Sequence, residues 1–138
     1  MREHGEGDLP LVSKDDGGLY DEGAESGIAG WGNTTPDGGT TGVLHAAKVP
    51  TVSDARCTEA YGSDFPGIVC ASDRADGGVD SCTYDSGGPL VIKGRLAGVV
   101  SGGGSDADGE KCAQPHFPGI YTRLSNYRDA LHKEIATP

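Results

Sequence analysis

The chain has 138 residues, 24 glycines and a formal net charge of −10. This length suits one domain, and the acidic charge argues against a nucleic-acid partner, because phosphate binding needs clustered lysine and arginine. No apolar run approaches the roughly 18 residues of a membrane-spanning helix, so the sequence predicts no membrane partner.

Residues 1–26 are polar and acidic, apart from a short apolar run from Leu9 to Val12. We expect this segment to be a surface arm or a connection between two barrels. The domain itself is predicted to span residues 27–138. The first residues show neither the apolar region nor the cleavage site of a secretory signal.

Short strands separated by glycine and proline turns are predicted along the rest of the chain. The dipeptide Lys93-Gly94 joins two of them as a hairpin. Six strands at such spacing favour an all-β barrel or sandwich. The predicted strands begin at Ile28, Gly42, Phe65, Pro89, Arg95 and Ile120.

Two short helices are also predicted. Ser53 can cap a helix that runs to Tyr61 and ends at Gly62. A C-terminal helix is expected to begin with Ser125 as its N-cap. Its apolar residues recur every four positions, so they share one face that can pack on the barrel; they are Tyr127, Leu131 and Ile135.

Four cysteines are spaced too widely for a C-x-x-C zinc motif, and only His116 lies near one of them. Disulfides are therefore predicted, which implies an oxidising compartment. Four cysteines allow three pairings, and their spacing does not choose among them. The four are Cys57, Cys70, Cys82 and Cys112.

The stretch D-S-C-T-Y-D-S-G-G-P-L-V, residues 80–91, singles out Ser86. A serine hydroxyl becomes a nucleophile only when a base takes its proton, and the reaction needs N–H groups for the developing oxyanion. Tyr84 replaces the first glycine of the G-x-S-x-G elbow, so an α/β-hydrolase is disfavoured. A simple glycine turn would explain Gly87 and Gly88 but not the residues before them.

This stretch resembles the active-site serine segment of trypsin-like serine proteases, which have the chymotrypsin fold of peptidase family S1. The resemblance continues in the family's order over residues 27–135. The further matching segments are G-I-A-G-W-G-N-T from Gly27, Cys57 to Ala71, Val99 to Ser101, Cys112 to Thr122, and Asn126-Tyr127.

The fold implied by this resemblance is the second barrel of these proteases, an antiparallel six-stranded Greek-key β-barrel with a short C-terminal α-helix. The resemblance also implies two disulfides, Cys57–Cys70 and Cys82–Cys112.

The same resemblance implies catalytic roles. Ser86 would be the nucleophile, and the backbone N–H groups of Tyr84 and Ser86 would form the oxyanion hole. Asp85 would pair with the amino terminus that zymogen cleavage creates. Ser101 would help to orient the catalytic aspartate.

A substrate pocket selective for lysine or arginine is implied as well. Asp80 would lie at its base, where a carboxylate pairs with a cationic side chain. Its other predicted residues are Ser81, Gly103, Gly119 and Tyr121. The expected partners are peptides or proteins that contain lysine or arginine, and neither a cofactor nor a metal is implied.

The family's catalytic base and aspartate lie in T-A-A-H-C-like and D-I-A-L-L-like segments, which this sequence does not contain. Both belong to an N-terminal barrel, which we expect to be supplied in cis or in trans. The chain is therefore expected to be one half of an extracellular endopeptidase, inactive alone. The histidines present, none in the family's context, are His4, His45, His116 and His132.

Two substitutions favour an alternative, a non-catalytic protease homologue that only binds. Tyr84 stands where the family has glycine, and Gly102 aligns where tryptophan is usual. A third hypothesis is a partner chain whose site is completed by a separate barrel. The acidic loop at residues 103–111 is expected to be a solvated loop, with a weak calcium site as the alternative.

Overall fold

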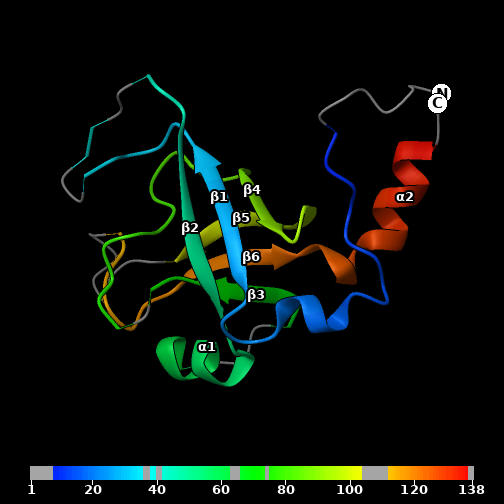
Figure 1. Cartoon of the computed structure of the whole chain (residues 1–138), viewed down its shortest axis with the longest axis horizontal. Helices are drawn as coiled ribbons and strands as arrows, with labels where there is room; N and C mark the ends of the chain where they lie inside the picture. Colours follow the sequence, from blue (N-terminus) through cyan, green and yellow to red (C-terminus); the bar gives the residue numbers. More distant parts are fainter. Residues whose placement is uncertain are drawn as a thin grey trace.

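Six antiparallel strands close into one barrel in the order β1-β2-β3-β6-β5-β4 (Figure 1). The computed structural model describes residues 8–35, 38–39, 42–62, 66–73, 75–103 and 112–136. The strands are β1 Glu25–Gly30, β2 His45–Val52, β3 Ile68–Ala71, β4 Pro89–Ile92, β5 Arg95–Gly103 and β6 Gly119–Arg123. The helices are α1 Asp54–Tyr61 and α2 Arg128–Ala136, with 3-10 turns η1 Gly17–Tyr20 and η2 Leu124–Asn126.

Two pairings between strands distant in sequence close the barrel. β1 pairs with β4 at Ser26 and Ile92, and β3 pairs with β6 at Cys70 and Ile120. The predicted all-β class, the six antiparallel strands and the C-terminal helix are therefore confirmed. The barrel interior is filled by buried aliphatic side chains and one tyrosine, among them Ile28, Val49, Val69, Leu90, Ile92, Ala97, Val100 and Tyr121.

Local sequence signals place the first helix and the hairpin as predicted. The Ser53 side chain accepts a hydrogen bond from the Arg56 N–H at 3.4 Å, and Gly62 ends α1 with a left-handed φ of 70°. Lys93 and Gly94 both have positive φ, 48° and 71°, as a two-residue hairpin turn requires.

The segment before β1 packs on the barrel instead of forming a loose arm. Val12 is fully buried, and Leu11 forms a parallel bridge with Leu96 of β5. The Tyr20 hydroxyl donates to the Ala97 carbonyl at 2.8 Å. Residues 11–20 therefore contribute to the core, although their sequence is mostly polar.

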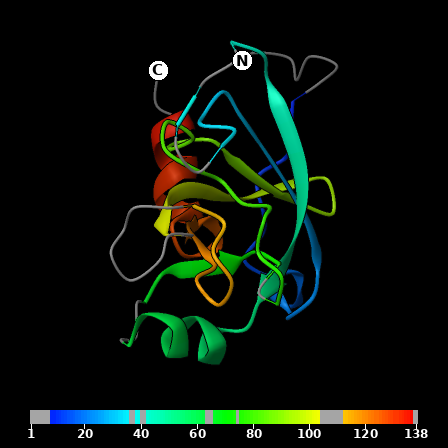
Figure 2. The same cartoon turned by 90° about the vertical axis from the view of Figure 1, so that its left-hand side faces the viewer.

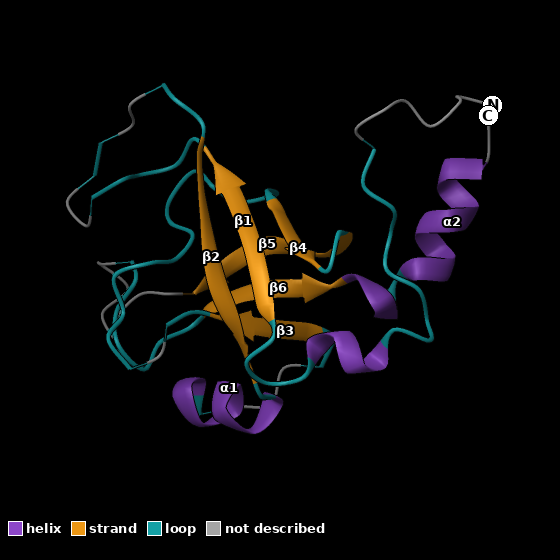
Figure 3. Ribbon diagram, in the orientation of Figure 1, coloured by secondary structure: helices purple, strands orange, loops and turns teal. Residues whose placement is uncertain are grey.

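The C-terminal helix begins later than predicted. Ser125 lies inside η2, and α2 begins at Arg128, because the tight turn at Leu124 directs that side chain into the core. Leu131 packs partly against the core, but Ile135 is 77% exposed. The expected apolar face therefore contacts the barrel only in part, and α2 stands beside it (Figure 3). No helix in the described ranges is long and apolar enough to cross a bilayer.

Candidate active site

Three segments far apart in the sequence gather at one end of the barrel, around residues 31–35, 75–88 and 112–118 (Figure 2). Hydrogen bonds and a disulfide join them. The Asn33 N–H donates to the Thr83 carbonyl at 2.9 Å, and the Gly78 N–H donates to the Ala113 carbonyl at 2.8 Å. The sequence segments quoted for the resemblance are thus brought together in space.

The structure contains the two disulfides that the resemblance implies, Cys57–Cys70 and Cys82–Cys112. The first joins α1 to β3, and the second fixes the start of the Ser86 loop to the segment at residues 112–118. Disulfides persist in oxidising compartments, so they fit a protein that works outside the reducing cytosol.

The Ser86 loop is held by its backbone and leaves its reactive groups accessible. Gly87 donates to the Val100 carbonyl at 3.0 Å, and Asp85 donates to the Cys82 carbonyl at 3.0 Å. Ser86 is exposed. Within the described part of the chain, neither the Ser86 hydroxyl nor the N–H groups of Tyr84 and Ser86 form a hydrogen bond. These three groups are therefore not engaged by any other described residue.

Asp85 points inward from the same loop and is held by neutral donors. Its carboxylate accepts hydrogen bonds from the Gly32 N–H at 2.8 Å and the Cys82 N–H at 3.0 Å. A Cβ on Gly30 would lie 1.9 Å from that carboxylate, and a Cβ on Gly32 would lie 2.4 Å from it. Both distances are shorter than real Cβ contacts allow. Glycine at both positions is thus required by Asp85, and the resemblance to a G-W-G turn gave no hint of this role.

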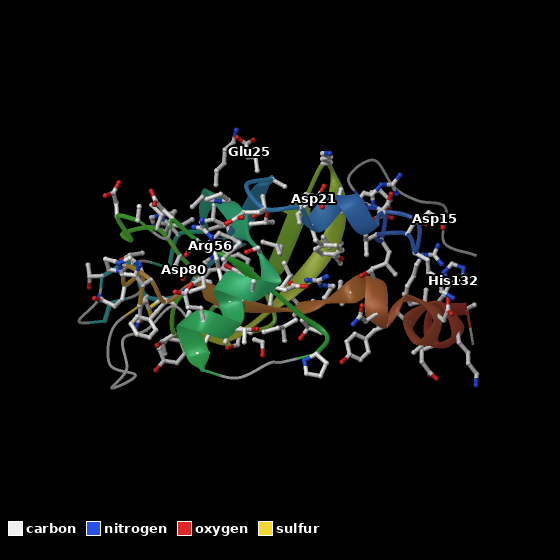
Figure 4. All side chains as sticks on the ribbon, turned by 90° about the horizontal axis from the view of Figure 1, so that it is seen from below. Asp15, Asp21, Glu25, Arg56, Asp80 and His132 are labelled. Atoms are coloured by element: carbon white, nitrogen blue, oxygen red, sulfur yellow. A yellow bond between two sulfur atoms is a disulfide. The ribbon has the colours of Figure 1, made fainter. Side chains whose placement is uncertain are left out.

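Asp80 lies at the same end of the molecule (Figure 4), with its carboxylate turned into the protein. One oxygen accepts from the Ser81 N–H at 2.7 Å and from the Tyr121 hydroxyl at 3.3 Å. The other oxygen is buried without a hydrogen-bond partner in the described residues. Burial raises the pKa of Asp80 to about 7, although the bonds from Ser81 and Tyr121 oppose the rise.

Tyr121 and Gly119 lie against the carboxylate of Asp80. Tyr121 is fully buried, and burial, together with the nearby charge of Asp80, raises the pKa of its phenol. The phenol therefore stays protonated and remains a donor. A Cβ on Gly119 would lie 2.4 Å from an Asp80 oxygen, so only glycine leaves room for the carboxylate.

A cavity of ≈ 580 Å³ opens between the three segments. Asp80, Ser81 and Asp85 line it, together with Asn33 and His45. The other predicted pocket residues, which are Gly103, Gly119 and Tyr121, do not line this cavity. Part of the expected pocket wall, residues 104–111, lies outside the described residues, as does the calcium alternative. The predicted pocket lining therefore stays a prediction.

Ser101 and Gly103 lie at the end of β5. Ser101 is exposed and sits at a register shift between Val100 and Gly102, a β-bulge that redirects a side chain. Gly103 has a φ of 80°, and a Cβ there would meet Ile120 and the Tyr61 hydroxyl below 3.0 Å. The space beside Gly103 is thus filled by protein atoms.

No described histidine is hydrogen-bonded to Ser86. His132 lies on α2, at the opposite end of the molecule from Asp80 (Figure 4). His116 is exposed with a φ of 69°, and His45 begins β2 opposite Gly30. His4 lies outside the described residues. The structure thus supplies no base to Ser86 from its described part.

The closed six-stranded barrel, together with the Asp85-Ser86-Gly87 loop at its end, defines the class of trypsin-like serine proteases. The family model described as "Trypsin" matches residues 9–131, and the chain therefore belongs to the trypsin family.

Individual proteins similar to this chain support the same family. The chain is 40% identical over 130 residues to "Trypsin" from Saccharopolyspora erythraea, covering 94% of this chain and 54% of that protein. It is 39% identical over 115 residues to "Trypsin" from Sus scrofa, covering 83% and 47%. The solved structure of neuropsin, a serine protease expressed in the limbic system of mouse brain, superposes with a TM-score of 0.77 at 34% identity, covering 92% and 53%. The chain spans about half the length of these relatives.

Proposed function

We propose that this chain provides the nucleophile, the oxyanion hole and the primary specificity pocket of an extracellular trypsin-like endopeptidase. Ser86 attacks the substrate carbonyl and forms an acyl-enzyme, which water then hydrolyses. The observation that carries this proposal is the exposed Ser86, whose own N–H and that of Tyr84 donate to no other group among the described residues.

The oxyanion hole of the proposal consists of the N–H groups of Tyr84 and Ser86. The backbone N–H of Asp85 donates to the Cys82 carbonyl. The N–H groups of its two neighbours, Tyr84 and Ser86, are left for an incoming oxygen. Each such donor is worth about 100- to 1,000-fold in turnover. Asp85 itself, which now accepts from two neutral N–H groups, is proposed to pair with a cationic amino terminus.

The base and the catalytic aspartate are proposed to come from a second barrel, in the same polypeptide or in another one. Ser101, exposed at its bulge, would support that aspartate. Without the second barrel the hydroxyl of Ser86 has no proton acceptor among the described residues, and we propose that the chain alone is inactive.

Specificity for lysine or arginine is proposed to rest on Asp80. Its carboxylate has one oxygen without a partner and no ion pair with a described residue. A guanidinium offers two parallel N–H groups to such a carboxylate. Binding of the cation requires the ionised acid, so affinity should increase as the pH rises through about 7, the pKa of Asp80.

Benzamidine, a flat bidentate cation, tests this pocket. At pH 8.5 we expect weak binding, with a Kd between about 0.1 and 1 mM, measured by ligand-observed NMR titration. Asp80→Asn should abolish binding, and Asp76→Asn, at an exposed cavity residue, should keep it. Equal binding by wild type and Asp80→Asn would refute the proposed lysine and arginine specificity.

A second step distinguishes the endopeptidase hypothesis from that of a non-catalytic homologue that only binds. After the benzamidine titration, a serine-directed fluorophosphonate is added, and its reaction with Ser86 is measured. Reaction of Ser86 after the chain is combined with a histidine-bearing barrel supports the enzyme. Benzamidine binding with an unreactive Ser86 under that condition supports the homologue that only binds.

A further inference from the structure

Tyr84 has an unusual combination of backbone and side chain. Its φ is 75°, in the left-handed region that glycine enters freely and bulky residues disfavour. Strained backbone of this kind persists where the surrounding structure imposes it, and it concentrates at functional sites. Here two backbone hydrogen bonds hold the loop on both sides of Tyr84. The Asn33 N–H donates to the Thr83 carbonyl, and the Asp85 N–H donates to the Cys82 carbonyl.

The ring of Tyr84 contributes nothing visible to the fold. The residue is 76% exposed, and it forms no hydrogen bond, ion pair or ring contact within the described part of the chain. A glycine would satisfy the backbone at this position. A benefit from the ring must therefore come from contact with another molecule.

The position of the ring relative to the reacting groups indicates which part of that molecule it meets. Tyr84 lies two residues before Ser86 and supplies one of the proposed oxyanion N–H groups, so its Cα is adjacent to the scissile carbonyl. Tyr84 does not line the cavity that contains Asp80 and Ser81. The ring is thus outside the proposed site for the residue before the scissile bond.

We propose that Tyr84 is a specificity-determining residue that contacts the substrate residue following the scissile bond and favours an aromatic side chain there. A tyrosine ring offers a large apolar surface with only two side-chain torsions, and aromatic pairs prefer to associate edge to face or offset. This inference rests on the proposed function of the Ser86 loop, whose cleavage chemistry it extends to the leaving group.

The test compares two peptides, acetyl-Ala-Ala-Arg-Phe-amide and acetyl-Ala-Ala-Arg-Gly-amide, by NMR titration of the full chain. Mass spectrometry verifies that both stay intact. In the wild-type chain the phenylalanine peptide should bind about two- to tenfold more tightly than the glycine peptide. Ring signals from ¹³C-tyrosine, with that of Tyr84 identified by its loss in Tyr84→Phe, should shift only with the phenylalanine peptide.

Three variants separate the ring from the backbone. Tyr84→Phe should keep the preference for phenylalanine, because it keeps the ring. Tyr84→Ala and Tyr84→Gly should both lose it, although only glycine relieves the left-handed strain. Retention of the preference in Tyr84→Ala, or no preference in the wild-type chain, would overturn the inference.

Benzamidine titration distinguishes this failure from failure of the proposed function. If Asp80-dependent benzamidine binding persists while the preference for phenylalanine is absent, only the role of Tyr84 is wrong. If benzamidine binding does not depend on Asp80 while the preference depends on the Tyr84 ring, the lysine and arginine pocket is wrong and the contact of Tyr84 stands.

Discussion

Replacement of Asp80 by asparagine should make the protein more stable at alkaline pH, and the gain should depend on pH. Burial raises the pKa of Asp80 from 3.8 to about 7, so between these values the folded state holds a proton that the unfolded state releases. The stability that this proton confers is full below about pH 4 and is lost as the pH rises through about 7.

The size of the effect follows from the same shift. A rise of roughly three pH units at about 1.4 kcal/mol per unit amounts to about 4 kcal/mol. The free energy of unfolding of the wild type should therefore decrease, relative to that of Asp80→Asn, by up to about 4 kcal/mol between pH 4 and pH 9. The other carboxylates contribute equally to the free energies of unfolding of the two proteins, so their contributions cancel in the difference.

Urea denaturation at several pH values, with both disulfides intact, measures this difference. The single tryptophan, Trp31, gives a fluorescence signal beside the Ser86 loop, and far-UV circular dichroism provides a second probe. Asp76→Asn, at an exposed residue of the same cavity, is the matched control and should follow the wild type. A constant difference between wild type and Asp80→Asn from pH 4 to pH 9 would show that Asp80 is not desolvated.

Two further predictions concern turnover and packing. The purified chain should not hydrolyse arginine ester or amide reporters above background, because no residue that the structure describes supplies a base to the Ser86 hydroxyl; turnover that disappears in Ser86→Ala would contradict this. Gly119→Ala should destabilise the fold by about 1–3 kcal/mol, since the new Cβ would lie 2.4 Å from an Asp80 oxygen. Gly102→Ala, where nothing lies within 4 Å, should change the free energy of unfolding by less than about 0.5 kcal/mol. Similar urea midpoints for the two glycine variants would refute the packing argument.

Elements with local signals were predictable from the sequence. The cap at Ser53, the left-handed Gly62 and the Lys93-Gly94 turn each act within a few residues, so the chain specifies them without its tertiary context. The start of α2 was not predictable in this way, because burial of Leu124 decides where the helix begins. The packing of residues 11–20 depends on β5, which lies 77 positions further along the chain at the Tyr20–Ala97 bond, and no local periodicity reveals it.

The candidate site could be predicted from the sequence only through its resemblance to a known family. The residues around Ser86 predict a nucleophile loop by resemblance, whereas composition or periodicity alone would predict only a glycine turn. The contacts of Asp85 with the Gly30–Gly32 turn and the burial of Asp80 against Gly119 arise from tertiary packing. The same packing also determines which residues line the cavity, and no residue spacing along the chain predicts that lining.

Closure of the barrel has a consequence for how this half-length chain can associate. Each of the six described strands is hydrogen-bonded to a neighbour on both sides, since β4 returns to β1 and β3 meets β6. Where these pairings run, the backbone donors and acceptors are engaged and are closed to an added strand. β2 meets β3 only at Thr51 and Val52, so its part from His45 to Pro50 is paired with β1 alone. The second barrel proposed above would therefore dock mainly through side chains on the outside of this closed unit. We expect the two halves to assemble as preformed bodies whose contact is sensitive to side-chain substitution.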